Sequence, residues 1–288
     1  MSRAHGGLTI RLLAVDIDGT LLDSQGRVSD RNRNALARAI DAGVEVALAT
    51  GRRYDFARPV FSLLPPPLTL VLSNGAIVKT RDGDTLMRRL LPRAAARGVL
   101  ARTRHHRDTA ALVFDRPRER QVVFERLDWE DTRHRRYFET NRPFLGESCP
   151  LEAALDEDPV QVMFTGTCAP MRALFDMLRS TSGDGTEYSV ALTEYLHRDF
   201  SLVDVVRAGC TKGSTVAEWA SQRGIRPAEI MAVGDNLNDL EMLEAAGLPI
   251  VMGNAVAELK SRGWAVTASN DEDGVAEAVE TYVLGEAS

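Results

Sequence analysis

Short apolar runs alternate with amphipathic segments at the start of this chain. Three such runs occupy residues 12–15, 44–49 and 68–72. Each run has the length of a buried strand rather than of a helix. Between the first two, residues 29–42 carry apolar side chains at helical spacing, with Ser29 or Asp30 as the expected N-cap and Gly43 as the stop. Strands that alternate with helices predict βαβ units and a parallel sheet.

The same alternation returns after residue 210. The pattern predicts helices over residues 212–223 and 239–246, and strands over residues 230–233, 250–252 and 265–267. Gly224 is expected to end the first of these helices. The two ends of the chain therefore predict a single α/β domain.

The middle of the chain has a different pattern, typical of an α+β domain inserted into the sheet domain. Its predicted elements are strands at residues 110–114, 121–124 and 160–165 and a helix at residues 171–180. We therefore predict a sheet domain made of residues 1–81 and 207–288, interrupted by an inserted domain of residues 82–206.

The composition is that of an ordinary globular protein, with 44% hydrophobic and 26% charged residues. A net charge of -6 does not favour nucleic-acid binding by the whole chain. The first apolar run stops at Asp16, so it is too short for a signal-peptide core or a membrane span. The three cysteines lack metal-ligand spacing and predict a reducing compartment. We expect a cytoplasmic protein without membrane contact.

Polar motifs follow the predicted strands at the edge where open α/β sheets bind ligands. The first is Asp16-Ile17-Asp18-Gly19-Thr20, in which Gly19 permits a sharp turn. Paired carboxylates suit Mg²⁺, and one can act as a nucleophile while its neighbour exchanges protons. A calcium loop of the D-x-D-x-D-G kind is excluded, because it places its glycine two residues later. A simple acidic turn after a strand remains an alternative for this motif alone.

Four motifs in order resemble those of the haloacid dehalogenase superfamily of phosphohydrolases. They are Asp16-Ile17-Asp18-Gly19-Thr20-Leu21-Leu22, Ala49-Thr50-Gly51-Arg52, Lys212-Gly213-Ser214 and Gly234-Asp235-Asn236-Leu237-Asn238-Asp239. Residues 74–76, 252–255 and 270–275 further resemble the Cof-type subfamily. The resemblance covers both halves of the sheet domain, whereas the inserted domain matches only in position and size. Residues 207–210 and 262–264 depart from the family pattern. The resemblance implies an α/β fold with a Rossmann-like parallel sheet core and an inserted α+β cap.

By this resemblance, Asp16 is the nucleophile that forms an aspartyl-phosphate. Asp18 protonates the leaving group and then activates water. Mg²⁺ is expected to bind the Asp16 carboxylate, the Asp18 backbone carbonyl and Asp235, with Asn236 and Asp239 nearby. For Asp239, an equal alternative is that its carboxylate only orients its neighbours.

The resemblance also implies a phosphate cradle. Its expected members are Thr50, Lys212, Asn238, Arg52 and the backbone N–H groups of Ile17 and Gly51. Alternatives stay open: Thr50 could cap a helix, Lys212 could be a solvated residue, and Arg52 could form a surface ion pair. Asn254 and Asn270 are interpreted as turn residues.

The predicted function is a Mg²⁺-dependent phosphatase for a small phosphorylated metabolite such as a sugar phosphate. The alternatives are a phosphomutase or phosphotransferase on the same fold, or a non-catalytic RNA- or ligand-binding protein. Residues 81–147 contain 16 Arg against 11 Asp plus Glu. Clusters at residues 102–107 and 133–136 could attract a second anionic group, although solvated surface is the preferred interpretation. The sequence predicts neither the oligomeric state nor the substrate.

Overall fold

The computed structural model describes residues 9–129, 135–181 and 187–286. The chain forms two compact units. The first, here called the sheet unit, contains Met1–Arg88 and Thr211–Ser288. The second, here called the inserted unit, contains Arg89–Cys210. Among the described residues, no helix combines the length and the apolar character needed to span a bilayer.

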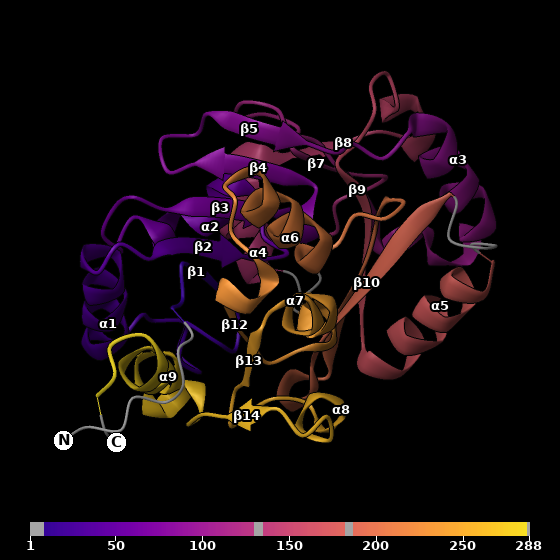
Figure 1. The fold of residues 1–288 in the computed structure, drawn as a ribbon. Coiled ribbons are helices and arrows are strands. Elements are labelled where there is room, and N and C mark those ends of the chain that lie inside the picture. The colour runs from indigo at the N-terminus through magenta and orange to yellow at the C-terminus, as the bar shows by residue number, and fades with distance from the viewer. Residues whose placement is uncertain (1–8, 130–134, 182–186, 287–288) are drawn as a thin grey trace. The chain divides into compact units, whose positions relative to one another are not determined.

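An eight-stranded sheet of order β14-β13-β12-β1-β2-β3-β4-β5 organises the sheet unit (Figure 1). Its strands are β1 Leu12–Val15, β2 Glu45–Ala49, β3 Thr69–Leu72, β4 Ile77–Thr80, β5 Thr85–Arg88, β12 Ile230–Gly234, β13 Leu248–Val251 and β14 Ala265–Val266. The six strands from β14 to β3 are parallel, which confirms the predicted fold class. The antiparallel strands β4 and β5 were not expected. They arise because the chain reverses directly after β3, where Leu72 pairs with Ile77.

Helices cover both faces of this sheet. They are α1 Asp30–Asp41, α2 Tyr54–Phe61, α6 Lys212–Gln222, α7 Leu240–Ala245, α8 Ala257–Lys260 and α9 Gly274–Tyr282. The strand order runs outward from β1 in both directions, so right-handed crossovers place α1 and α7 on opposite faces. Accordingly, α1 packs against α9, and α6 packs against α7 (Figure 1). As predicted, Ser29 caps α1, and its side chain accepts from the Asn32 N–H.

The middle of the sheet is buried from both sides. All four residues of β1 have no exposed surface. This agrees with the rule that parallel strands covered on both faces are nearly continuous apolar runs. The strand order changes direction at β1, so the carboxyl ends of β1, β2 and β12 meet at a topological switch point. Three of the four predicted motifs follow these strands, and the fourth lies at the start of α6.

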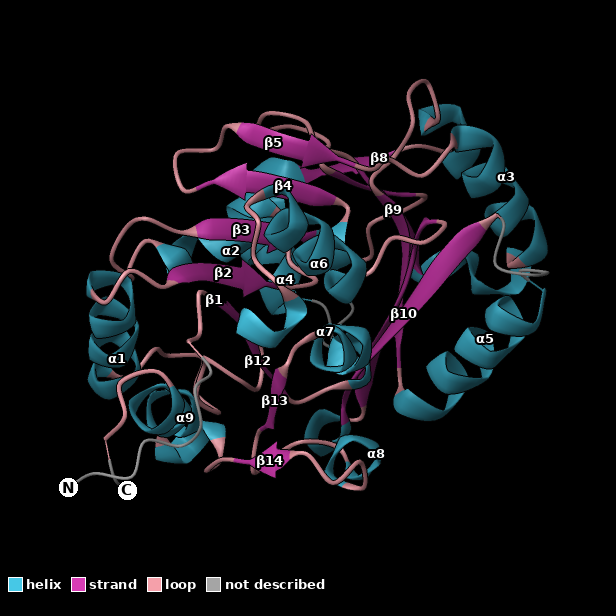
Figure 2. Cartoon of the chain, in the orientation of Figure 1, coloured by secondary structure: helices cyan, strands magenta, loops and turns pink. Residues whose placement is uncertain are grey.

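The inserted unit has its own six-stranded sheet of order β10-β11-β9-β6-β7-β8 (Figure 2). Its strands are β6 Ala110–Val113, β7 Val122–Phe124, β8 Leu145–Glu147, β9 Gln161–Gly166, β10 Tyr188–Tyr195 and β11 Phe200–Arg207. Its helices are α3 Arg93–Arg102, α4 Arg135–Asn141 and α5 Cys168–Thr181, and α5 packs on β9, β10 and β11. The sequence pattern missed the strands β8, β10 and β11 and the helices α3 and α4. Residues such as Ser189, Thr193 and Glu194 interrupt the apolar run in β10.

Short 3-10 helices connect several of these elements. They are η1 Ser73–Gly75, η2 Arg104–Thr109, η3 Arg142–Phe144, η4 Leu151–Ala154, η5 Leu196–Arg198, η6 Pro227–Glu229, η7 Leu237–Asp239 and η8 Asn270–Glu272. The predicted helix at residues 239–246 is therefore split between η7 and α7.

The turn after β3 depends on a close approach between two backbones. Gly75 has φ +97, and a Cβ atom there would overlap the carbonyl oxygen of Thr211. The Thr215 hydroxyl donates to the Gly75 carbonyl at 2.9 Å. This turn therefore joins β3 to the start of α6, and only glycine fits there.

Gly75→Ala should lower the free energy of unfolding by about 3 kcal/mol, because strain in the left-handed region adds to the overlap with Thr211. Gly43→Ala is the matched control. Gly43 has φ +85 but nothing within 4 Å of an added Cβ, so that variant should lose only about 1 kcal/mol. Urea denaturation of both variants measures the difference. Equal losses would show that the contact with Thr211 contributes nothing.

Candidate active site

Three buried carboxylates lie together at the carboxyl edge of the sheet unit. Asp16 is the first residue after β1, and its N–H donates to the Val233 carbonyl at 3.0 Å. The residue is 4% exposed, and its side chain lies near those of Asp235 and Asp239. Ligand oxygens of these three residues lie within 4.8 Å of one another, close enough to hold one metal ion.

A buried ammonium group links two of these carboxylates. Lys212 is the first residue of α6 and is 1% exposed. Its Nζ donates to Asp16 Oδ1 at 2.6 Å and to Asp239 Oδ1 at 2.7 Å. A helix N-terminus disfavours a cation, so the two carboxylates must offset both this effect and the cost of burial. The structure thus makes Lys212 part of the acidic cluster rather than a solvated residue.

Burial and mutual charge shift the pKa values of the residues in this cluster. Burial, with the nearby Asp239 charge, raises the pKa of Asp16 to about 7, although Lys212 opposes this shift. Burial and Asp16 also raise the pKa of Asp235 well above its ordinary value. Burial disfavours the charged form of Lys212, but Asp16 and Asp239 outweigh it and raise the pKa of Lys212. One ammonium cannot balance three carboxylates, so this set of oxygen donors fits a hard divalent cation.

Asp239 also orders the loop that carries Asp235. Its Oδ2 accepts from the N–H groups of Asp235 and Asn236, both at 3.1 Å. The Thr20 hydroxyl donates to Asp235 Oδ1 at 3.1 Å. Asn236 caps η7, because its side-chain oxygen accepts from the Leu237 N–H. Asp239 therefore makes the contacts expected if its carboxylate orients its neighbours. Asn236 makes a local capping contact.

Asp18 is paired with Arg52. The guanidinium donates through Nε at 2.7 Å and Nη2 at 2.6 Å to the two carboxylate oxygens. It also lies over the Phe56 ring, 4.6 Å from the centroid. Arg52 therefore forms an ion pair, as one of the alternatives for it held. Its partner is Asp18, the expected acid–base residue, and both side chains are largely buried rather than at the surface.

Thr50 at the end of β2, Asn74 in η1 and Asn238 in η7 form a connected group. Thr50, 1% exposed, accepts through Oγ1 from the Arg52 N–H at 3.1 Å. The Asn74 N–H donates to the Thr50 carbonyl at 3.0 Å. Asn238 Nδ2 donates to Asn74 Oδ1 at 3.1 Å. Within the described residues, the buried Asn238 Oδ1 has no hydrogen-bond partner.

Asn74 was not predicted as a site residue. Its backbone has φ 53, and its amide would lie 3.3 Å from a Cβ atom added to Gly51. Gly51 therefore allows the close approach of Asn74. The sequence feature that could have pointed to Asn74 is the Asn74-Gly75 pair just after a predicted strand. Ile17, between the two motif aspartates, has no exposed surface, so its apolar side chain is part of the core.

Several described arginines of the inserted unit form ion pairs, among them two of the cluster at residues 102–107. Arg102 pairs with Glu187 at 2.8 Å. Arg107 pairs with both Glu125 and Glu152. For the cluster at residues 133–136, residues 133 and 134 and the side chains of residues 135 and 136 lie outside the described part of the chain.

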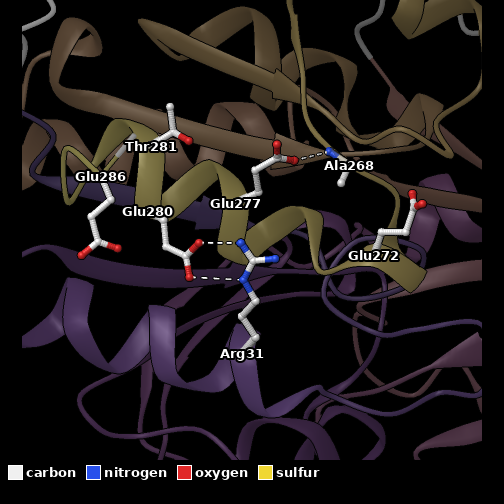
Figure 3. Close-up of a pocket in the computed structure, with 7 residues that line it drawn as sticks. All are labelled: Arg31, Ala268, Glu272, Glu277, Glu280, Thr281 and Glu286. Carbon is white, nitrogen blue, oxygen red and sulfur yellow. Dashed lines mark hydrogen bonds and ion pairs between the residues drawn. The ribbon is translucent and has the colours of Figure 1, made fainter. Parts of the chain in front are cut away.

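A surface cavity of about 410 Å³ lies beside α1 and α9 (Figure 3). It is lined by Arg31, Ala268, Glu272, Glu277, Glu280, Thr281 and Glu286. Arg31 pairs with Glu280, and Glu277 accepts from the Ala268 N–H. None of the predicted site residues lines this cavity, so it is separate from the acidic cluster.

Comparisons with known proteins agree with this geometry. Residues 13–279 match the haloacid dehalogenase-like hydrolases. The chain is 28% identical to the 5-amino-6-(5-phospho-D-ribitylamino)uracil phosphatase YcsE of Bacillus subtilis, over 99% of the chain and 100% of that protein. It is 27% identical to the pyridoxal phosphate phosphatase YbhA of Escherichia coli, over 96% and 100%. Identity to the HMP-PP phosphatase of Serratia proteamaculans is 31%, over 87% and 86%.

Solved structures show the same fold. A phosphatase of this superfamily from Bacteroides thetaiotaomicron superposes with a TM-score of 0.76 at 25% identity, covering 97% of each chain. A haloacid dehalogenase-like hydrolase from Bacillus subtilis gives a TM-score of 0.77 at 24% identity, covering 94% of this chain and 99% of that one.

The predictions of the family, the fold class and a phosphoric monoester hydrolase are confirmed by these matches. The relatives matched along nearly their whole length are phosphatases. The ordered motifs, the switch-point cluster and the matched residues 13–279 lead to one conclusion: the chain belongs to the haloacid dehalogenase-like hydrolases and is a phosphatase of that superfamily.

Proposed function

We propose that this protein is a cytoplasmic, Mg²⁺-dependent phosphatase that hydrolyses a small phosphorylated metabolite through an aspartyl-phosphate on Asp16. The observation that carries the proposal is the buried contact of Lys212 with Asp16, inside a cluster with Asp235 and Asp239. A nucleophile held by a cation and surrounded by ligand oxygens is the arrangement that phosphoryl transfer needs.

The first step transfers the phosphoryl group to the enzyme. A carboxylate oxygen of Asp16 forms a bond to phosphorus while the bond from phosphorus to the leaving oxygen breaks. Asp18 gives its proton to that oxygen, so the product leaves as an alcohol. Arg52 donates to both Asp18 oxygens in this structure, so one of these contacts would have to open before the carboxyl group could carry and deliver the proton.

The second step releases phosphate. Asp18, now ionised, takes a proton from a water molecule as that water attacks phosphorus. The bond between phosphorus and the Asp16 oxygen breaks, and the Asp16 carboxylate is restored. The same residue acts as acid and then as base, so the enzyme returns to its starting protonation after each cycle.

The metal would be held by the Asp16 and Asp235 carboxylates and the Asp18 backbone carbonyl. Bound there, Mg²⁺ would neutralise the repulsion between the Asp16 carboxylate and the phosphate dianion. Asp239 already accepts from Lys212 and from two backbone N–H groups. We therefore assign Asp239 the task of orienting Lys212 and the Asp235 loop, in place of direct metal binding.

The phosphoryl oxygens would be held by the Thr50 hydroxyl, Lys212 and the Asn238 amide, with the N–H groups of Ile17 and Gly51. Asn238 is anchored through Asn74. These donors are buried or set in tight turns, so little reorganisation is needed as charge moves.

The relatives suggest the substrate class. Their names specify a phosphoribitylaminouracil, pyridoxal phosphate and HMP-PP, all small phosphorylated compounds. We infer that the substrate is a small phosphorylated compound of similar size. The alcohol from which the phosphoryl group is removed is not assigned.

Phosphate release from a panel of phosphorylated metabolites tests the proposal. With Mg²⁺, at least one small phosphomonoester should be hydrolysed, and excess chelator should abolish release. Product analysis should find free phosphate and the alcohol. An isomerised phosphate ester would favour the phosphomutase alternative, and salt-sensitive RNA binding without any release would favour the binding-protein alternative.

Asp16→Asn should reduce kcat by a factor on the order of 10⁴ or more, because an amide cannot serve as this nucleophile. Asp18→Asn should reduce kcat by about 10²–10⁴ while Mg²⁺ affinity stays within about threefold, because only its backbone carbonyl is assigned to the metal. Asp41→Asn, on the exposed end of α1, is the matched control and should not change kcat. Substantial turnover by Asp16→Asn would refute the covalent scheme.

Mg²⁺ affinity should rise with pH up to about 7. The raised pKa of Asp16, about 7, means that the metal-free site is protonated below that pH, so binding must release a proton. The raised pKa also affects the free energy of unfolding. Protonation of Asp16 stabilises the metal-free fold fully at pH values below the ordinary pKa of an aspartate, and this stabilisation is lost as pH rises through about 7. Because the pKa of Asp235, the other carboxylate assigned to the metal, is raised as well, affinity should gain about tenfold or more per pH unit below 7.

Calorimetric titration at pH 6 and pH 8, in buffers of different ionisation enthalpy, measures both affinity and proton release. Asp41→Asn should behave like the unmodified protein. The same affinity at both pH values, with no proton release, would contradict the pKa assigned to Asp16.

A further inference from the structure

The turn after β13 contacts both segments that build the acidic site. Asn254 Nδ2 donates to the carbonyl of Gly19, the residue after Asp18, at 2.7 Å. Two residues later, the Val256 N–H donates to the Asp235 carbonyl at 3.0 Å. One short turn therefore joins the backbone of the Asp18 loop to the backbone of the Asp235 loop.

Asn270 extends this contact to the far end of the Asp18 loop. Its N–H donates to Asn254 Oδ1 at 2.9 Å, and its Nδ2 donates to the Leu22 carbonyl at 2.8 Å. Beside it, Asp271 Oδ1 accepts from the Ser24 N–H at 2.7 Å. Asn254 and Asn270 thus form a bonded pair that holds the loop at both ends, here called the asparagine clamp.

The opposite side of the loop rests on Asp235. Thr20 donates to the Asp235 carboxylate, and a Cβ atom at Gly19 would overlap that carboxylate. Gly19 has φ +83 and forms the turn between Asp18 and Thr20. The loop is therefore fixed between the Asp235 side chain and the asparagine clamp.

Turn formation alone does not explain these asparagines. A turn asparagine bonds to backbone groups a few residues away. Here the side-chain amides donate across 235 and 248 residues of sequence, to Gly19 and Leu22. Asn254 is also exposed, so packing does not account for its position. Its hydrogen bonds are directed at the loop that carries the acid–base residue.

We propose that Asn254 and Asn270 are positioning residues that hold the Asp18 loop at a fixed distance from Asp235 during phosphoryl transfer. The inference rests on the proposed function. The clamp touches main-chain carbonyls and lies outside the set of groups assigned to phosphate, metal or proton. Its loss should displace Asp18 from the reacting oxygen and leave substrate binding to the phosphate cradle.

Asn254→Asp and Asn270→Asp are the test variants. Each replaces an amide donor by a carboxylate oxygen that repels a carbonyl, while the contact between Asn254 Oδ1 and the Asn270 N–H is kept. Ser261→Ala is the matched control, because it removes one side-chain hydrogen bond, to the Glu258 carbonyl at 2.9 Å, without touching the loop. Each clamp variant should lower kcat by about 10- to 100-fold with KM within about threefold, as expected for misplaced reacting groups. Ser261→Ala should match the unmodified enzyme.

Hydrogen–deuterium exchange supplies a readout that needs no activity. In both clamp variants, the amides of residues 19–24 should exchange faster, while the thermal midpoint stays within about 3 °C of the unmodified protein. The use of two variants guards against misfolding of one.

The outcomes separate the two proposals. An unmodified enzyme that hydrolyses its substrate, with clamp variants of equal kcat, would overturn the clamp alone. A raised KM at constant kcat would also overturn it, since that result indicates substrate binding. If the unmodified protein hydrolyses nothing, the proposed function fails, and unchanged exchange at residues 19–24 would then overturn the clamp as well.

Discussion

The buried ammonium of Lys212 is the interaction on which the rest of the site depends. It bridges the end of β1, through Asp16, and the start of the segment after β12, through Asp239. These three residues come from positions far apart in the chain, and the parallel sheet brings them together. Removing the ammonium would leave two buried carboxylates without the cation that balances their charge, which is strongly destabilising. The contact that offsets this cost also places Asp16, the proposed nucleophile, so the same ion pair would serve both stability and chemistry.

Much of this arrangement could be predicted from the sequence. Three strands are largely apolar and are followed directly by polar motifs: Leu12–Val15, Glu45–Ala49 and Ile230–Gly234. Carboxyl ends of parallel strands meet at one edge, so the order of motifs predicted that Asp16, Thr50 and Asp235 would converge. The lysine at the start of a helix was informative because its position is locally unfavourable.

Other features depend on side-chain directions that a linear pattern does not contain. The contact between Arg52 and Asp18, and that between Asn238 and Asn74, join residues whose relative placement follows from tertiary packing. Asn254 and Asn270 were interpreted as turn residues because turn propensity is local, whereas their amides bond to a distant loop. The strands β4 and β5 were missed because an alternation of strands and helices predicts only parallel neighbours. Mixed polar and apolar residues concealed β10 in the inserted unit.

The second junction of the inserted unit lies at Cys210 and Thr211, immediately before Lys212. Thr211 caps α6: its hydroxyl accepts from the Ser214 N–H, and the Ser214 hydroxyl accepts from the Thr211 N–H, both at 3.0 Å. This reciprocal cap fixes the helix start within the sheet unit, so the position of the lysine does not depend on the residues that precede the junction. The inserted unit can therefore diverge in sequence without displacing Lys212.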